Sequence, residues 1–297
     1  MKKEEYLSAT VDFSRWFMPE ELTALYHTPI YGSLTEPQRR RYNQLHALYF
    51  NEQTMFFEKA LARNVLGYFL TRPLSEELKS GLRQFEAEEE EHSEMFRSLN
   101  QKCAPETYSE RDFHFIQVPR AAAGMLHFIS RRPTWFPLLL WLMHLQEERS
   151  LSSGRVFLKF ADSLEPHFVA AQRKHLADEI GHVRWDQELL DCVWPKTGVL
   201  LRRFNSRLLG WMIEEYFSTP KRSAVRVVAA LVGEFAELQP HYPEFCRALR
   251  RLGSDPNYRR SFYCTSNVPN TIRMFDAWPE LRSLSKVMPG YIPGSNA

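Results

Sequence analysis

The chain has 297 residues, of which 44% are hydrophobic, 13% aromatic and 25% charged. This composition allows a sizeable apolar core and excludes an intrinsically disordered chain. A formal net charge of +2 argues against a dedicated nucleic-acid-binding protein, which would carry a basic patch. The four cysteines form no Cys-x-x-Cys pair, which argues against a cysteine zinc site.

The chain shows neither an apolar signal-peptide core nor an apolar run long enough to span a membrane. Residues 1–5 are mostly charged, and no signal-peptide core follows them. The longest apolar run, residues 135–143, is far shorter than the roughly 20 residues of a membrane span. We therefore expect a cytoplasmic protein that binds neither membranes nor nucleic acid.

Apolar residues recur at helical spacing in the first third of the chain. A first helix is predicted over residues 37–70; it ends before Pro73, because proline lacks an N–H and disfavours helix at the preceding residue. Ser75 is a predicted N-cap for a second helix that runs to about residue 99. A loop-rich stretch over residues 103–119 and a short helix over residues 121–130 follow.

The remaining segments complete an all-α prediction. A third helix is expected to start within residues 132–137 and to end near Ala161, and a fourth runs from Pro166, a suitable first-turn residue, to about Trp194. Proline-interrupted helices are expected over residues 197–252, followed by an irregular wrapping tail over residues 253–297. We expect a single domain over residues 1–297, with a helical-bundle core at about residues 37–194.

Two Glu-x-x-His motifs carry the candidate chemistry. Glu89 and His92 lie three residues apart, so both can reach one metal from the same helix face, and Glu179 and His182 repeat this spacing. His175 lies one turn before Glu179 and extends that stripe. Taken alone, the acidic run at residues 86–91 is typical of a solvated helix face.

An internal repeat supplies two partner glutamates. Glu58 precedes Glu89 by 31 residues, and Glu148 precedes Glu179 by the same number. Each pair would lie about 20 Å from its hairpin turn, at one level of the bundle. Glu52 and Glu147 are the rival choices; they miss this register, but both alternatives remain open.

This ligand set is typical of a ferritin-like di-iron four-helix bundle. Carboxylates are hard bridging ligands that suit iron, and imidazoles add neutral nitrogen donors; manganese accepts the same set. Buried, clustered carboxylates repel one another, and a pair of cations removes that cost. The predicted ligands are Glu58, Glu89, His92, Glu148, His175, Glu179 and His182.

Other polar residues near the motifs have weaker support. Asp178 and Asp186 are either acceptors for the ring N–H groups of ligating histidines or surface acids. His144 lies one turn before Glu148 and is a further candidate. No catalytic residue beyond the ligands is predicted, and no arginine can be assigned to a substrate carboxylate.

With its third histidine, the ligand order resembles that of the p-aminobenzoate N-oxygenase family of non-haem di-iron monooxygenases. The order is Glu58, Glu89 with His92, Glu148, and then His175, Glu179 and His182, within a helical layout over roughly residues 20–250. The resemblance implies two iron ions that react with O₂ after reduction by an external ferredoxin or reductase, through a peroxo di-ferric intermediate. It also implies stepwise oxidation of an arylamine to hydroxylamine, nitroso and nitro products, and it is compatible with a homodimer.

Two other functions compete with this reading. A di-iron hydroxylase or desaturase acting on an acyl or small aliphatic substrate would use the same metal site. An iron-handling ferritin relative would need little beyond four helices, so the large C-terminal segment argues against it. We expect that segment to close a substrate pocket lined by residues 135–143 together with Met55, Phe56 and Phe57.

Overall fold

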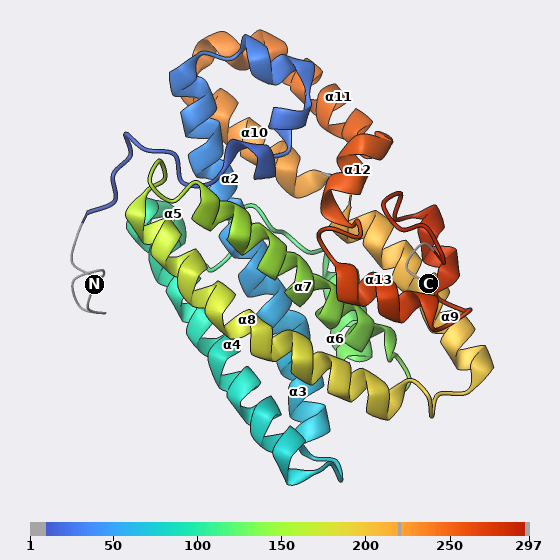
Figure 1. Ribbon diagram of the computed structural model, residues 1–297. Coiled ribbons are helices and arrows are strands. Elements are labelled where there is room, and N and C mark those ends of the chain that lie inside the picture. The colour runs from blue at the N-terminus through green and yellow to red at the C-terminus, as the bar shows by residue number, and fades with distance from the viewer. Residues whose placement is uncertain (1–9, 219–220, 295–297) are drawn as a thin grey trace.

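Four long helical segments pack side by side as a bundle in the computed structural model, which describes residues 10–218 and 221–294 (Figure 1). The bundle consists of α2 (Glu36–Phe57) continued by α3 (Arg63–Leu70), α4 (Glu76–Cys103), α7 (Leu138–Lys159) and α8 (Pro166–Val193). No β-strand occurs in these described ranges, so the all-α prediction is confirmed. Residues 1–5, which bear on the signal-peptide expectation, lie outside them.

Local side-chain contacts explain where the bundle helices begin. The Ser75 hydroxyl accepts the Leu78 N–H at 3.2 Å and caps α4 as predicted. Glu165 plays the same part for α8, since its carboxylate accepts the His167 N–H at 2.7 Å and the Phe168 N–H at 3.2 Å. These caps end the two hairpin connectors and set where each ligand-bearing helix starts.

The first bundle helix covers the predicted range, but it contains a turn of different geometry that the sequence did not predict. Residues Glu58–Ala62 form a π-helical turn, η4, between α2 and α3. A second π-helical turn, η5 (Ile213–Phe217), follows α9 (Val199–Met212). Such turns insert an extra residue into a helix and are frequent at functional sites.

Shorter elements surround the bundle. α10 (Arg222–Glu234) and α11 (Tyr242–Leu252) form a lobe with the N-terminal segment at one end of α2 (Figure 1). The expectation of an irregular tail is wrong in part, because α12 (Pro256–Phe262) and α13 (Pro269–Asp276) form within it and α13 packs against α7. The remaining elements are η1 (Glu20–Leu22), η2 (Leu25–His27), η3 (Pro29–Ser33), α5 (Pro105–Tyr108), α6 (Arg120–Ser130), η6 (Ala236–His241) and η7 (Arg282–Lys286).

The bundle helices approach closely where α4 meets α8. A Cβ atom added to Gly81 would lie 2.2 Å from Nε1 of Trp185, so only glycine lets this indole pack on the backbone of α4. Trp185 lies in turn beside Phe85, whose ring stacks on His182 with centroids 3.9 Å apart. Packing at this contact therefore holds one histidine of the motif in a fixed orientation.

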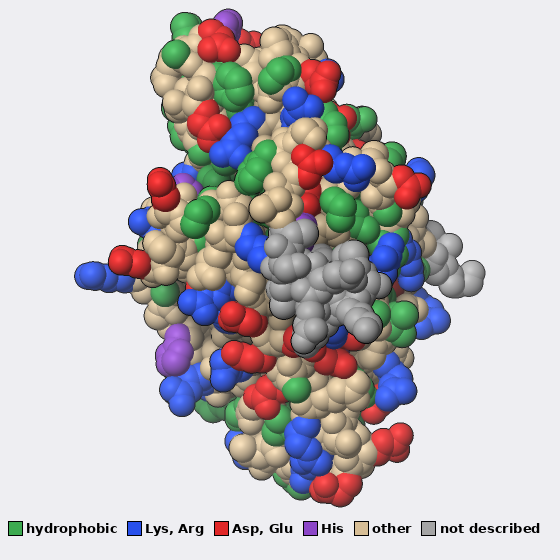
Figure 2. Space-filling model, turned by 90° about the vertical axis from the view of Figure 1, so that its left-hand side faces the viewer, with side chains coloured by type: hydrophobic (Ala, Val, Ile, Leu, Met, Phe, Trp, Pro, Cys, Tyr) green, Lys and Arg blue, Asp and Glu red, His purple; other side chains and the backbone are tan. Residues whose placement is uncertain are grey.

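The surface and the helix lengths bear on possible partners. On the face shown in Figure 2, acidic and basic side chains are interspersed rather than separated into large areas of one sign. This distribution agrees with the small net charge. Among the described residues, none of the helices combines the length and the apolar character that crossing a bilayer requires.

Candidate metal centre

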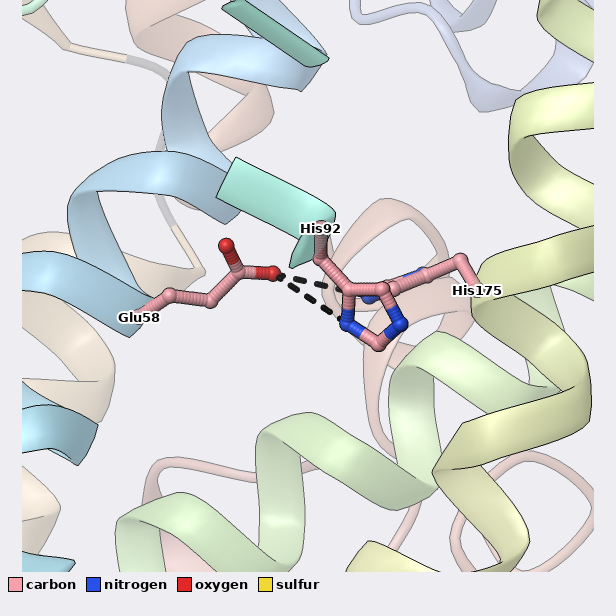
Figure 3. Close-up of side chains that lie close together, drawn as sticks. All are labelled: Glu58, His92 and His175. Atoms are coloured by element: carbon pink, nitrogen blue, oxygen red, sulfur yellow. Dashed lines mark ion pairs between the residues drawn. The ribbon is translucent and has the colours of Figure 1, made fainter. Parts of the chain in front are cut away.

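Two adjacent clusters of buried side chains lie inside the bundle. The first contains Glu58, His92 and His175, which point toward one another from three different helices (Figure 3). The second contains Glu89, Glu147, Glu179 and His182. Within each cluster, the potential ligand atoms all lie within 4.8 Å of one another. The structure thus brings together six of the seven predicted ligands, with Glu147 in place of Glu148.

The first cluster is arranged around one carboxylate oxygen. Oε1 of Glu58 lies 3.9 Å from Nδ1 of His92 and 3.7 Å from Nε2 of His175. Ser93 donates its hydroxyl proton to the other oxygen, Oε2, at 2.6 Å. Glu58 opens the π-helical turn η4, so this local irregularity presents a ligand to the site.

Two glutamates connect the clusters. Oε1 of Glu89 lies 3.8 Å from Nδ1 of His92 and 3.3 Å from Nδ1 of His182. Oε1 of Glu179 lies 2.8 Å from Nε2 of His175 and 3.6 Å from Nδ1 of His182. Each carboxylate therefore approaches histidines of both clusters, which is the position that a bridging ligand needs.

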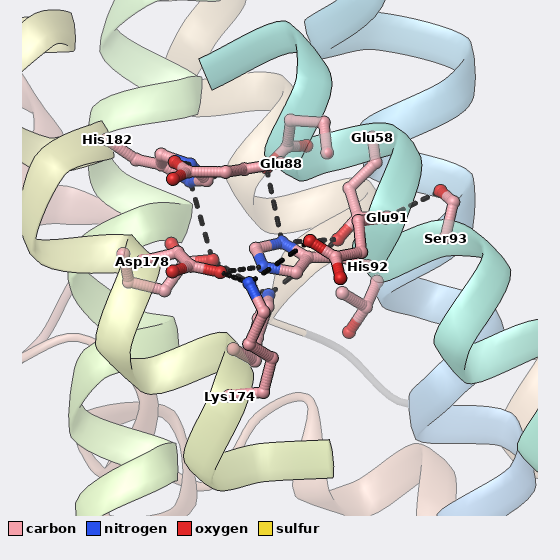
Figure 4. A network of polar contacts seen from close by, with 12 residues as sticks. Glu58, Glu88, Glu91, His92, Ser93, Lys174, Asp178 and His182 are labelled. Atoms are coloured by element: carbon pink, nitrogen blue, oxygen red, sulfur yellow. Dashed lines mark hydrogen bonds and ion pairs between the residues drawn. The ribbon is translucent and has the colours of Figure 1, made fainter. Parts of the chain in front are cut away.

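Acidic side chains outside the clusters orient two of the histidines (Figure 4). Asp178 accepts a hydrogen bond from Nε2 of His92 at 2.8 Å, and Glu88 accepts one from Nε2 of His182 at 3.1 Å. When either ring is neutral, this contact holds its proton on Nε2 and the lone pair of Nδ1 faces the cluster. The structure confirms the expected contact of Asp178 with a histidine of the motif.

The sequence did not single out Glu88, and two other candidate residues lie outside the two clusters. Glu88 directly precedes Glu89, but within the acidic run at residues 86–91 nothing in the sequence distinguishes it from its neighbours. Asp186 and His144 are fully buried, but neither of them belongs to the two clusters. Their side-chain oxygen and ring nitrogen atoms have no hydrogen-bond partner within the part of the chain that the structure describes.

The clusters are electrostatically strained without a cation. Burial and the charges of Glu58 and Glu147 raise the pKa of Glu89 well above its ordinary value. Burial and the charge of Glu179 do the same to the pKa of Glu147. Burial alone would lower the pKa of His175, but the Glu179 and Glu58 carboxylates raise it to about 10. Protons therefore partly balance a surplus of buried negative charge.

The donor atoms fit a pair of metal ions. Several buried atoms of the clusters have no hydrogen-bond partner among the described residues; these are Oε1 of Glu58, Oε2 of Glu89, Oε2 of Glu179, Nδ1 of His92 and Nδ1 of His182. Leaving buried polar atoms without partners is costly. Cations would satisfy these atoms, and a mixed carboxylate and imidazole set suits iron or manganese.

The sequence left open whether Glu52 or Glu58, and whether Glu147 or Glu148, faces the metal site, and the structure distinguishes between them. Glu148 turns away from the clusters and accepts the backbone N–H groups of Asn270 and Thr271, each at 2.8 Å. Glu52 likewise faces elsewhere and accepts the Tyr108 hydroxyl proton at 2.7 Å. Of each rival pair, only Glu58 and Glu147 belong to the clusters. The expectation for Glu148 is therefore wrong.

The error has a simple geometric source. Glu58 lies 12 residues before the end of α3, and Glu89 lies 13 residues after the start of α4. Glu147 and Glu179 show the same two spacings in α7 and α8. The second hairpin, however, has a connector of 6 residues where the first has 5. The helical register repeats, but the sequence offset is one residue longer in the second half.

A cavity of about 370 Å³ adjoins the clusters. Four cluster residues line it; they are Glu58, Glu89, Glu147 and His175. Its apolar wall includes Phe56 and Phe57, as expected, together with Leu126 and Ile129 of α6 and residues of η5. Residues 138–143 and Met55 are buried in the core instead, and Trp135 is 69% exposed.

One helix face contributes a polar strip to this cavity. Gln146, Arg149, Ser150 and Ser153 of α7 line it at helical spacings of three, four and seven residues. Arg149 was not recognised from the sequence as a pocket residue. The signal was present, because these polar residues form a stripe directly beside Glu147.

Comparison with known proteins identifies the family. The sequence model of the family described as P-aminobenzoate N-oxygenase AurF matches residues 4–252. A search of curated proteins found no match. The matched range covers most of the chain and contains all residues of both clusters. The chain therefore belongs to the p-aminobenzoate N-oxygenase family, whose members are helical di-iron oxygenases.

Proposed function

We propose that the protein is an O₂-dependent di-iron monooxygenase that N-oxygenates an aromatic amine. The observation that carries this proposal is the cavity of about 370 Å³ whose wall includes ligand candidates from both clusters. A substrate in this cavity would lie directly beside the metals. An iron-storage protein has no need of such a substrate-sized space next to its metal centre.

Seven side chains would hold the metals: Glu58, Glu89, His92, Glu147, His175, Glu179 and His182. Bound iron would supply the redox chemistry that activates O₂. Asp178 and Glu88 would keep the protons of the His92 and His182 rings on Nε2, which leaves Nδ1 free to bind metal. Ser93 would hold the Glu58 carboxylate in its inward orientation.

The cavity suits a small aromatic molecule. Its volume falls in the lower part of the usual range for small-molecule sites, roughly 300–1,000 Å³. Aromatic and aliphatic side chains, among them Phe57 and Ile129, would exclude water and pack against a ring. The polar strip of α7 would receive the polar end of the substrate.

The first oxygenation step balances with O₂ and an external electron donor. An arylamine, O₂, two electrons and two protons give an N-arylhydroxylamine and water. The electrons would come from a ferredoxin or a reductase. One oxygen atom enters the new N–O bond, and the other leaves as water.

Anaerobic loading with ferrous iron, followed by rapid mixing with O₂, tests this function. About two irons per chain and a transient visible absorption band that decays faster with an arylamine would support it. Product analysis by mass spectrometry would then show the N-hydroxy, nitroso or nitro compound. Oxidation of acyl or aliphatic substrates alone would favour the hydroxylase or desaturase alternative, and accumulation of ferric mineral would favour iron handling.

A further inference from the structure

We propose that the C-terminal segment, residues 256–291, positions Glu147 in the metal centre by holding its neighbour Glu148. The inference rests on the proposed function, because it concerns the same metal site. The segment lies beyond residues 4–252, which match the family. It nevertheless packs against α7, the helix that carries Glu147 (Figure 1).

Three hydrogen bonds join Glu148 to the first turn of α13. Its Oε1 accepts the N–H of Asn270, and its Oε2 accepts both the N–H and the hydroxyl proton of Thr271, all at 2.8 Å. Glu148 and Thr271 are both buried. Since both carboxylate oxygens are bound, the position of Glu148 relative to α13 is fixed in distance and in orientation.

Two further contacts connect the segment to α7 at the same level. Gln146 donates from Nε2 to the Tyr263 hydroxyl at 2.9 Å. The Arg149 guanidinium lies over the Phe262 ring, 4.7 Å from its centroid. The C-terminal segment therefore contacts the residue before Glu147 and the two residues after it.

Because α7 is a rigid helix, these contacts also fix the direction in which Glu147 points. Successive residues of an α-helix are about 100° apart, so Gln146, Glu148 and Arg149 point in three directions that differ from that of Glu147. Glu147 points inward, with Oε2 at 3.6 Å from Nδ1 of His182. Any rotation of α7 that withdrew Glu147 from the cluster would break the contacts with the C-terminal segment.

The segment is itself tied together, so it can act as a fixed support. Gly290 lies so close to the backbone at Tyr263 that an added Cβ would stand 2.4 Å from the Tyr263 carbonyl oxygen. Tyr291 donates its hydroxyl proton to Oδ1 of Asp276 at 2.9 Å, at the end of α13. Both ends of α13 are thus held: Glu148 binds its first turn, and Tyr291 binds Asp276 at its last residue.

Anaerobic equilibrium dialysis against Fe²⁺, with metal analysis of the protein, tests the proposal without relying on activity. We expect the wild-type protein to bind two ions and Glu148→Gln to bind one of them about 10- to 100-fold more weakly, the usual effect of losing an outer contact of a metal site. Glu52→Gln is the matched control, because Glu52 is also a buried carboxylate that accepts a hydroxyl proton and backbone N–H groups from a distant segment. Among the described residues its hydrogen bonds go to Tyr108 and to residues 114–116, none of which flanks Glu147, so it should leave both affinities unchanged.

Thr271→Val is the second variant, in case Glu148→Gln does not fold. It removes one of the three donors and keeps the carboxylate and the side-chain volume, so we expect a smaller weakening of the same ion. Wild-type affinity in the folded variants, or an equal loss in Glu52→Gln, would overturn the proposal while leaving the metal centre intact. If the wild-type protein itself took up no iron, the proposed function would fall, and this inference with it.

Discussion

Glu147 and Glu148 are consecutive residues of α7 whose carboxylates serve different parts of the molecule. Glu147 faces the metal cluster, where Oε2 lies 3.6 Å from Nδ1 of His182. Glu148 accepts three hydrogen bonds from Asn270 and Thr271 at the start of α13. A ligand candidate and an anchor for the C-terminal segment are therefore adjacent in the sequence.

Removing cluster carboxylates should affect the two metals unequally. Glu147 belongs to the second cluster only, whereas Glu89 approaches His92 and His182 and so contacts both clusters. We expect Glu147→Ala to lower the iron content from about two ions per chain to about one, and Glu89→Ala to lower it to nearly none. Metal analysis after anaerobic loading measures this.

Glu188→Ala is the control for these variants, since Glu188 lies on the exposed face of α8 and pairs with Arg184. Its iron content should equal that of the wild type. Full occupancy in Glu89→Ala would contradict the bridging position that we assign to this carboxylate.

Loss of either outer carboxylate should weaken metal binding without abolishing it. Asp178→Asn and Glu88→Gln would no longer favour the Nε2 proton of His92 and His182, respectively. We expect an affinity about 10- to 100-fold lower for the ion that the affected histidine binds. Glu90→Gln offers a matched comparison in the same acidic run, because Glu90 pairs with Arg63 on the surface of the bundle. Equal affinities in all three variants would argue against a role for the outer carboxylates.

Glu52 should stabilise the fold rather than bind metal. Its buried carboxylate accepts the Tyr108 hydroxyl proton and backbone N–H groups of residues 114–116, in the loop that continues into the cavity wall. In Glu52→Gln the side-chain NH₂ would face these donors, so we expect a loss on the order of 3 kcal/mol in the free energy of unfolding. Urea denaturation measures it, with exposed Glu110→Gln as the control. If Glu52→Gln lost iron but kept its stability, Glu52 would be a metal ligand after all.

His46 should make the protein acid-sensitive. Burial lowers the pKa of His46 from 6.5 to about 3, and its neutral ring accepts the Ala24 N–H through Nε2 at 3.4 Å. The unfolded chain therefore takes up a proton near pH 6.5, and the folded chain takes it up only near pH 3. This contribution to stability is complete above pH 6.5 and falls by at most about 1.4 kcal/mol per pH unit as the pH drops toward 3.

Comparison with His46→Gln isolates this effect from other titrating groups. Glutamine cannot take up the proton, so unfolding measured at pH 7, 6 and 5 should show a shallower pH dependence in the variant. Identical slopes for both proteins would mean that the pKa of His46 is the same in the folded and unfolded states, which would contradict the lowered pKa.

The features predicted correctly from the sequence depend on local rules. The Ser75 cap, the start of α8 at Pro166 and the shared face of Glu89 and His92 each depend on a few neighbouring residues. Local propensity and helical periodicity are sufficient for such features. The bundle follows from them, because short connectors force neighbouring helices to lie antiparallel.

The features that were missed depend on contacts between distant segments. The shift from Glu148 to Glu147 arises from one additional connector residue, which no periodicity reveals. The π-helical turn at Glu58 and the cavity-lining position of Arg149 depend on packing against other helices. Likewise, α13 begins where its N–H groups meet Glu148, 122 residues earlier in the chain.

The end of the family match at residue 252 does not mark a point at which the chain can be shortened. The ring of Trp141 lies 5.4 Å from that of Phe275, and Trp194 lies 6.5 Å from Trp278. Trp141 and Trp194 are nearly inaccessible to solvent and share a core with Ile272. A protein truncated at residue 252 would expose these indoles to water, and we expect it to aggregate instead of behaving as a smaller enzyme.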